Sequence, residues 1–399
     1  MSQRFKFDRM ELAGSLGDLG TLLPIAIAMV LFNGLNPLGL FVSIGLFYVL
    51  SGIYFGVTVP VQPMKVIGAY AIATAMSADQ IMASALLMGA FLLIIGATGA
   101  IDLIRRITPK PVIRGVQLST GALLISGGVK FIIGTSTYQK LQDAVEPHLV
   151  VQSLGPVPIS LAIGAIAAMA TLYLLNSRKC PAGLFVVLAG IFSGLVLGAR
   201  IDLGEGAVGL HLPELLPFGF PGEADFTFAL FALVLPQLPM TLGNAVLAYT
   251  DLSKVYFADQ SARVTNRGAC VSMALANFLS FCVGGMPLCH GAGGLAAHYC
   301  FGARTAGSNV MIGFLFLALA VLLGEGIVGL FNLLPMSVLG ALLVFAGSQL
   351  TLTIMDLERR KDYFVAALIL GITLASNLAA GFIAGMIVAH LLRWEKLSV

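Results

Sequence analysis

The chain has 399 residues, of which 58% are hydrophobic and only 10% are charged, whereas about 25% of the residues of an ordinary soluble domain are charged. This composition argues against a soluble fold, and the formal net charge of +3 reflects membrane orientation rather than a nucleic-acid partner. Apolar stretches of about 20 residues, the length that crosses a hydrocarbon core, recur along the chain. We therefore expect an all-α polytopic membrane protein surrounded by lipid.

The first apolar stretch follows a basic amino terminus and contains Asp18 and several glycines. A signal peptide has a more uniform apolar core, so we interpret this stretch as a retained first span. Apolar runs and their breakers predict about fourteen spans in all. These cover residues 11–32, 37–56, 58–76, 80–101, 108–129, 153–175, 181–199, 226–248, 267–283, 285–301, 306–323, 327–349, 362–376 and 378–392.

Basic residues gather on one side of these spans, as they do in cytoplasmic loops. With the amino terminus inside, the inner segments hold Arg4, Lys6, Arg9, Arg105, Arg106, Lys110, Arg114, Arg178, Lys179, Lys254, Arg263, Arg267, Arg304, Arg359, Arg360, Lys361, Arg393 and Lys396. The outer segments keep Lys130, Lys140 and Arg200. We expect an even number of spans in the plasma (inner) membrane with both termini cytoplasmic, and twelve spans is the main alternative.

The chain resembles itself at a spacing of about 225 residues, although chance is a competing explanation in a sequence this rich in Gly, Pro, Ala and Leu. The matching positions are Gly17-Asp18 with Gly243-Asn244, Pro60 with Pro287, and Pro111 with Pro335. Two halves of seven spans each would make an inverted repeat, because an odd number of spans reverses the entry side. We expect one membrane transport domain, 1–399, with a first repeat at 1–200 and a second at 201–399.

The third and tenth spans are interrupted in the same way. Each opens with β-prone or small residues, FGVTVPV and CVGGMPL, passes a proline and then becomes helical. We expect short extended segments followed by two half-helices, whose starts are marked by Pro60, Pro63 and Pro287. Their free N–H groups and positive dipole ends would face a common point near the bilayer centre. This arrangement predicts an anion site.

Polar side chains at membrane depth are costly, so they indicate where function resides. Almost the whole set consists of Asp18, Gln62, Lys65, Gln237, Asn244, His290 and His298. Lys65 supplies a positive charge, Gln62 and His290 supply hydrogen bonds, and glycines allow backbone amides to approach a ligand closely. The candidate substrate-binding residues are Gln62, Lys65, His290, Gly291, Gly293, Asn244 and Ser15, and Asp18 is the candidate for ion coupling or charge balance.

Each candidate also has a purely structural interpretation. The HGAGG segment starting at His290 could serve tight helix packing, and Lys65 could snorkel to the interface. Asp18 could neutralise Lys65 or cap a broken helix, Asn244 could join helices, and His298 is more often a packing residue than a ligand.

Enzymatic and metal chemistry is not expected. The five cysteines, Cys180, Cys270, Cys282, Cys289 and Cys300, include no CxxC pair and mostly lie in apolar segments, so we interpret them as buried small hydrophobic residues. Cys289 precedes His290, but adjacent residues do not have the geometry of a catalytic pair, and no orienting carboxylate is evident. We expect no cofactor and no bound metal.

Three blocks resemble the signature blocks of a known family: ELAGSLGDLGTLLPI at 11–25, PVQPMK at 60–65 and MPLCHGAGGLAAHYCFGARTAG at 286–307. They are similar to the molybdate transporter family related to the SulP sulfate permeases, over most of the chain. The positions that match are Gly17, Asp18, Gly20, Pro60, Gln62, Pro63, Lys65, Pro287, His290, Gly291, Gly293, Gly294 and Arg304. Typical SulP permeases carry a regulatory domain after the last span, and its absence here favours the molybdate branch.

The resemblance implies a fold of seven-plus-seven inverted repeats. In such a fold the first four spans of each half form a substrate-carrying core, and the last three form a gate. It also implies a substrate site between the third and tenth spans, flanked by the first and eighth. A mechanism in which the core slides against the gate is implied in the same way.

We therefore predict a secondary active transporter of a tetrahedral oxyanion, with molybdate as first choice and sulfate as second. A proton or sodium ion would drive it through Asp18 or His290, and a homodimer is an open alternative to a monomer. A nucleobase or weak-acid carrier is one alternative function, although such carriers usually have carboxylates where this chain has Asn244 and His290. An anion channel is a second alternative function, and accumulation of the anion against its gradient would exclude it.

Overall fold

The computed structural model describes residues 4–101, 107–136, 139, 153–175, 177, 181–203 and 208–393. Helices make up most of this part of the chain. Some residues used in the sequence predictions lie outside it: Arg105, Arg106, Lys140, Arg178, Lys179, Cys180 and Lys396.

The first half of the chain contains eight α-helices and three short strands within the described ranges. The helices are α1 (Arg9–Ser15), α2 (Leu19–Asn33), α3 (Pro37–Phe55), α4 (Lys65–Thr74), α5 (Ala78–Thr98), α7 (Lys110–Ile133), α9 (Ile159–Leu174) and α10 (Ala182–Val196). The strands are β1 (Gln62–Pro63), β2 (Ser153–Leu154) and β3 (Val157–Pro158).

The second half continues in the same manner. Its elements are α11 (Glu223–Ala229), η1 (Leu230–Val234), α12 (Leu235–Met240), η2 (Thr241–Ala248), α13 (Tyr249–Phe257), η3 (Ala258–Ser261), α14 (Asn266–Val283), β4 (Leu288–Cys289), α15 (Ala292–Phe301), α16 (Ala306–Leu323), η4 (Gly324–Gly326), α17 (Ile327–Phe331), α18 (Met336–Thr351), η5 (Leu352–Asp356), α19 (Arg360–Ala375) and α20 (Leu378–Leu391).

Every predicted span contains at least one of these helices. Within the described residues, 6 helices are long and apolar enough to cross a membrane, or 7 if α1 and α2 form one span bent by 47°. Several of the remaining helices are apolar but shorter, with 10–17 residues. The helical membrane class is thus confirmed, and the full number of spans stays a prediction.

Several predicted spans have different limits in the structure. The sixth, predicted at 153–175, opens with β2 and β3, and its helix α9 begins only at Ile159. The eighth, predicted at 226–248, belongs to a helical stretch that runs from Glu223 to Ser261. It contains the π-helical segments η1 and η2 on either side of α12. Pro236 and Pro239 lie in α12, and because proline has no N–H, wider π turns next to them let the helix continue.

The twelfth span was predicted at 327–349 as one segment, and this was wrong. The first part, α17, continues from α16 in one helical stretch that ends at Phe331. The second part, α18, begins at Met336, with Pro335 in a non-helical conformation before it. Proline disfavours a helical conformation in the residue before it, so the chain turns here.

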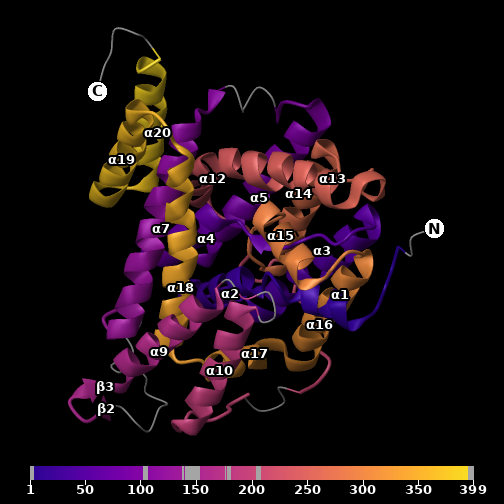
Figure 1. The fold of residues 1–399 in the computed structure, drawn as a ribbon, viewed down its shortest axis with the longest axis vertical. Coiled ribbons are helices and arrows are strands. Elements are labelled where there is room, and N and C mark those ends of the chain that lie inside the picture. Colours follow the sequence, from indigo (N-terminus) through magenta and orange to yellow (C-terminus); the bar gives the residue numbers. More distant parts are fainter. Residues whose placement is uncertain are drawn as a thin grey trace.

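The helices form two groups, which Figure 1 shows on opposite sides of the molecule. In one group α3 packs on α16, α5 packs on α14, and α1 contacts α15 and α16. In the other group α7 packs on α18 and α19, and α9 contacts α10 and α18. We call the first group the core helices and the second the gate helices. The pair α2 and α4 belongs to the core group and meets the gate at α7, α10 and α18.

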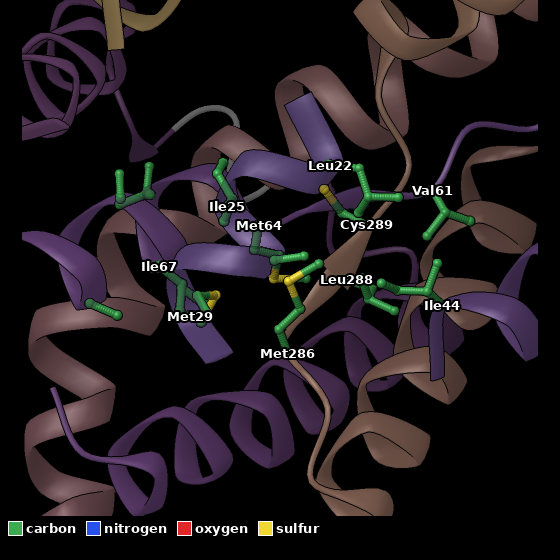
Figure 2. Packing of buried hydrophobic residues seen from close by; sticks show 14 of the residues in the cluster. Leu22, Ile25, Met29, Ile44, Val61, Met64, Ile67, Met286, Leu288 and Cys289 are labelled. Atoms are coloured by element: carbon green, nitrogen blue, oxygen red, sulfur yellow. The ribbon is translucent and has the colours of Figure 1, made fainter. Parts of the chain in front are cut away.

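The two interrupted spans meet at the centre of the core group. Strand β1 pairs with β4 in an antiparallel ladder, with Gln62 opposite Cys289 and Pro63 opposite Leu288. Apolar side chains from α2, α3 and α4 surround the crossing, as Figure 2 shows for Leu22, Met29 and Ile44. The predicted extended openings are confirmed, and each leads into a half-helix of 10 residues, α4 or α15.

Two buried asparagines hold the extended segments. Asn309 accepts a hydrogen bond from the Val59 N–H at 2.8 Å and donates to the Val59 carbonyl at 2.7 Å. Asn277 does the same for Leu288, at 3.2 Å and 2.8 Å. A carboxamide can replace a neighbouring strand because it has one donor and one acceptor side, like a peptide group. These contacts satisfy backbone groups that would otherwise be buried without partners.

Candidate binding site

A cavity of about 120 Å³ lies where the core and gate groups meet. Its lining comes from α2, α4, α12 and η2 on the core side and from α7, α18 and η5 on the gate side. The lining residues are Thr21, Ile25, Lys65, Gln117, Leu124, Met240, Asn244, Ala346, Gln349, Leu350 and Thr353. A single water needs about 10–15 Å³ of such space, so the cavity can hold a larger ligand.

Lys65 begins α4 and lies against this cavity. Its ammonium group has no hydrogen bond and no ion pair to any residue that the structure describes. Lys65 is only half-buried, so it does not point into the packed core. Lys65 therefore lies at the cavity, where the binding interpretation places it, and its role as a ligand stays a prediction.

The amino end of α4 is partly occupied by Gln237. The Gln237 carboxamide oxygen accepts hydrogen bonds from the N–H groups of Val66 at 2.9 Å and Ile67 at 3.3 Å, and its NH₂ group donates to Thr241 at 2.8 Å. Two of the amides that were expected to face a ligand are therefore used by the protein. What α4 offers to the cavity is chiefly the charge of Lys65.

The amino end of α15 is different. The N–H groups of Ala292, Gly293 and Gly294 have no acceptor within the described ranges. A Cβ atom added at Gly293 would meet nothing within 4 Å, so this residue borders open space. A Cβ at Gly291 would meet the Gln62 carboxamide and approach Asn244 Nδ2 at 3.5 Å. Free amides at a helix amino terminus attract anions, and Asn244 connects this end to the cavity.

Asp18 lies at the break between α1 and α2, next to Gly294 near the start of α15. It occupies the N-cap position of α2, but its side chain makes no capping hydrogen bond, so the capping interpretation is wrong. Its Oδ1 accepts a hydrogen bond from Gln62 Nε2 at 2.8 Å. Asp18 Oδ2 and Gln62 Oε1 are both buried without a hydrogen-bond partner among the described residues. A buried acceptor without a partner is a position where a proton or a small cation could bind.

Of the sequence candidates, Lys65 and Asn244 line the cavity. The others are not in its lining: Ser15, Asp18, Gln62, His290, Gly291, Gly293 and His298. His290 is fully buried, with Nδ1 bonded to the Pro60 carbonyl at 2.9 Å and Nε2 to the Ser272 hydroxyl at 3.1 Å. The hydroxyl of Ser15 donates to the Leu12 carbonyl at 2.8 Å. His298 pairs with Thr58 at 2.9 Å.

The predicted half-helix prolines precede the helices. Pro63 lies in β1, two residues before α4, and Pro60 and Pro287 precede the strands. An extended segment is a natural place for proline, because its fixed backbone angle suits that conformation. Of the described cysteines, Cys270 and Cys289 are buried as expected, whereas Cys282 is partly exposed and Cys300 is exposed. The helix α15 turns that side chain outward.

Sequence reasoning missed several buried polar residues. Gln117 on α7 lines the cavity, and Asn277 and Asn309 hold the strands. Glu11 accepts hydrogen bonds from the N–H groups of Arg304 and Thr305 at 3.0 Å each. All four stand in or beside apolar stretches of the sequence, so a complete search for polar residues at membrane depth would have found them.

A second cavity of about 300 Å³ adjoins the first. The two share Gln117, Met240, Asn244 and Thr353 in their linings. The second cavity also borders Lys110 and Arg114, which form ion pairs with Asp356 at 3.2 Å and 2.6 Å. This cavity leads from the binding region to the end of the molecule where α7 begins.

Two solved structures with the same fold are described as transporters of anions. The transmembrane domain of the cyanobacterial bicarbonate transporter BicA matches with a TM-score of 0.65 at 17% identity, covering 96% of this chain and 97% of that one. The murine Solute Carrier 26 family member A9 anion transporter, in the inward-facing state, matches with a TM-score of 0.65 at 16% identity, covering 98% of this chain and 69% of that one. These likenesses confirm the predicted relation in fold.

Sequence comparison gives the family. Molybdate transporter 1 of Arabidopsis thaliana is 29% identical over 96% of this chain and 87% of its own length. Molybdate transporter 1 of Chlamydomonas reinhardtii is 29% identical over 94% of this chain and 90% of its own length. A family model described as "Molybdate transporter of MFS superfamily" matches residues 10–124 and 229–350, more than half of the chain. The chain is therefore a multi-pass membrane protein that belongs to this molybdate transporter family.

Proposed function

We propose that this protein carries molybdate across the plasma (inner) membrane as a secondary active transporter, with both termini in the cytoplasm. The observation that carries the proposal is the unpaired Lys65 ammonium, which lines a cavity between the core and gate helices. The amino terminus of α15, in the core group, adds free amides. A dianion of tetrahedral shape satisfies both a point charge and several converging N–H donors. The relatives named molybdate transporters support the same substrate.

Alternating access is supported by where the cavity lies. It separates the core helices from the gate helices, so a shift of one group against the other would open it to either side. On the side away from Lys110, the ring of Phe32 on α2 stacks on Phe131 of α7 with centroids 4.5 Å apart. The second cavity opens on the Lys110 side, where the sequence predicts the cytoplasm. The resting arrangement then faces inward.

The seven-plus-seven inverted repeat is supported by the strand crossing. Gln62 pairs with Cys289 in an antiparallel register, and these two residues are separated by the same offset as the matching prolines Pro60 and Pro287. An inverted repeat with its axis at this point brings equivalent segments together in this way. The two half-helices then approach the site from opposite sides of the membrane.

The experiment that tests the substrate is a titration of purified protein with molybdate, tungstate, sulfate and phosphate. We expect molybdate and tungstate to bind with similar Kd values, because they share charge, shape and size. Sulfate should bind more weakly, since its shorter bonds reach fewer donors in a site formed for a larger anion. A sulfate Kd below that of molybdate would reassign the substrate, and displacement of molybdate by uracil would favour a nucleobase carrier.

Asp18 is proposed as the coupling residue, because its unpartnered Oδ2 lies beside Gly294 at the substrate end of α15. A proton or cation bound there would offset the carboxylate while the anion is bound. We expect Asp18→Asn to keep molybdate binding within about threefold and to abolish accumulation against a gradient, because the amide cannot exchange a proton. Uptake into proteoliposomes under imposed proton or sodium gradients measures this.

Counterflow exchange in the same proteoliposomes is the control for Asp18→Asn. Exchange needs binding and conformational change but no net coupling, so it should persist in the variant. Accumulation that follows the gradient as in the wild type would exclude Asp18 from coupling. Loss of both exchange and binding would assign Asp18 a structural role.

A further inference from the structure

The gate side of the cavity is lined by three polar side chains, Gln117, Gln349 and Thr353. Hydrogen bonds fix the orientation of Gln117. Gln117 lies on α7 and is only 4% exposed, and it borders both cavities. Its Oε1 accepts a hydrogen bond from Arg114 Nη1 at 2.8 Å and from the Thr353 hydroxyl at 3.0 Å. A guanidinium group only donates hydrogen bonds, so the atom that faces Arg114 must be the amide oxygen.

This orientation leaves the NH₂ group of Gln117 for the cavity. The NH₂ group has no hydrogen-bond acceptor among the described residues. It is also not fully covered by other atoms, so it reaches open space. Lys65 and Asn244 line the same cavity from the core side. A ligand held by the core would therefore meet an N–H donor from the gate.

Arg114 is in turn held by Asp356. Arg114 Nε donates to Asp356 Oδ1 at 2.8 Å, and Nη2 donates to Oδ2 at 2.6 Å. A paired guanidinium and carboxylate of this kind fixes the position of the guanidinium plane. Hydrogen bonds thus link the mouth of the second cavity with the binding region, through Asp356, Arg114 and Gln117.

We propose that Gln117 is a gate-side ligand of the transported oxyanion, and that Arg114 and Thr353 are positioning residues that turn its NH₂ group toward the anion. The inference rests on the proposed function and adds a substrate contact outside the two half-helices. Since Gln117 belongs to the gate and Lys65 to the core, an anion bound between them favours their close approach. The site then selects ligands whose oxygens accept hydrogen bonds on two opposite sides.

The decisive variant is Gln117→Glu, which keeps the side-chain size and the acceptor for Arg114 and Thr353. It replaces the donating NH₂ group by a negatively charged oxygen that repels an oxyanion. We expect the Kd for molybdate, measured by titration of the purified full chain, to rise at least about 30-fold while Tm stays the same or rises. Removing a hydrogen bond to a charged group alone raises the Kd by about 10-fold to 150-fold.

The control is Gln80→Glu, which adds the same charge at the start of α5, away from both cavities. It should leave the Kd unchanged. Arg114→Met tests the positioning role: combined with Gln117→Leu, it should add little to the effect of Gln117→Leu alone, because Arg114 acts through Gln117. Additive effects would overturn the positioning role.

An unchanged Kd in Gln117→Glu would overturn the proposed contact. If Lys65→Met loses binding in the same assay while Gln117→Glu keeps it, the proposed function stands and this inference fails. If the folded wild type binds neither molybdate nor tungstate, the proposed function fails first.

Discussion

Replacing Lys65 by methionine will raise the Kd for molybdate by about 10-fold to 150-fold without lowering Tm. Methionine has a similar length and no charge, so the substitution removes only the ammonium group. A hydrogen bond to a charged partner contributes about 1.5–3 kcal/mol, which corresponds to this range of Kd. The ammonium has no partner among the described side chains, so its removal relieves a desolvation cost.

The combination of weaker binding and unchanged or higher stability is the informative result. Residues that serve function at the expense of stability behave in this way. Lys254→Ala is the matched control, because Lys254 is an exposed lysine on α13 that pairs with Asp251 at 3.6 Å, and surface pairs contribute little. Isothermal titration and thermal unfolding of the three proteins measure both quantities. A Lys65→Met protein that unfolds at a lower temperature with unchanged Kd would show that Lys65 supports the fold.

The membrane class and the interrupted spans could be predicted because they depend on local sequence. Long apolar runs need no tertiary information, and a proline after small or β-prone residues predicts an extended opening before a helix. The limits of the eighth and twelfth spans could not be read this way. The helix continues through Pro236 with the help of a π turn, but it stops at Pro335. The residues that pack around each proline decide which of the two happens.

The candidate site could be predicted in outline and not in its assignment of partners. Gln62 and Asp18 are joined by a hydrogen bond, and Lys65 lines the cavity, whose lining does not include the other two. The sequence could not show that Gln237 would cover the amides of α4, since this contact joins residues 171 positions apart. It also could not show that His290 would be satisfied by Pro60 and Ser272. Hydrogen-bond partners of this kind are set by tertiary packing.

Gly293 and Gly294 provide the second strong prediction, because they are adjacent and face different surroundings. A methyl group at Gly294 would collide with Asp18 Oδ2 and with Pro60, whose Cβ would lie 2.7 Å away. A methyl group at Gly293 would meet nothing within 4 Å. We expect Gly294→Ala to lose transport and to lower Tm by several degrees, since overpacking costs about 1–3 kcal/mol. Gly293→Ala should keep the wild-type Tm.

Binding separates the two variants further. The added methyl in Gly293→Ala occupies the open space beside a free N–H group, so it should raise the Kd for molybdate while the fold is intact. In Gly294→Ala the half-helix α15 must move away from Asp18 and Gln62, so the loss of binding follows a loss of stability. Thermal unfolding and molybdate titration of both purified variants distinguish these outcomes. If both glycines tolerate alanine with unchanged Tm and Kd, the amino end of α15 does not border the anion, and the site must lie nearer to the gate helices.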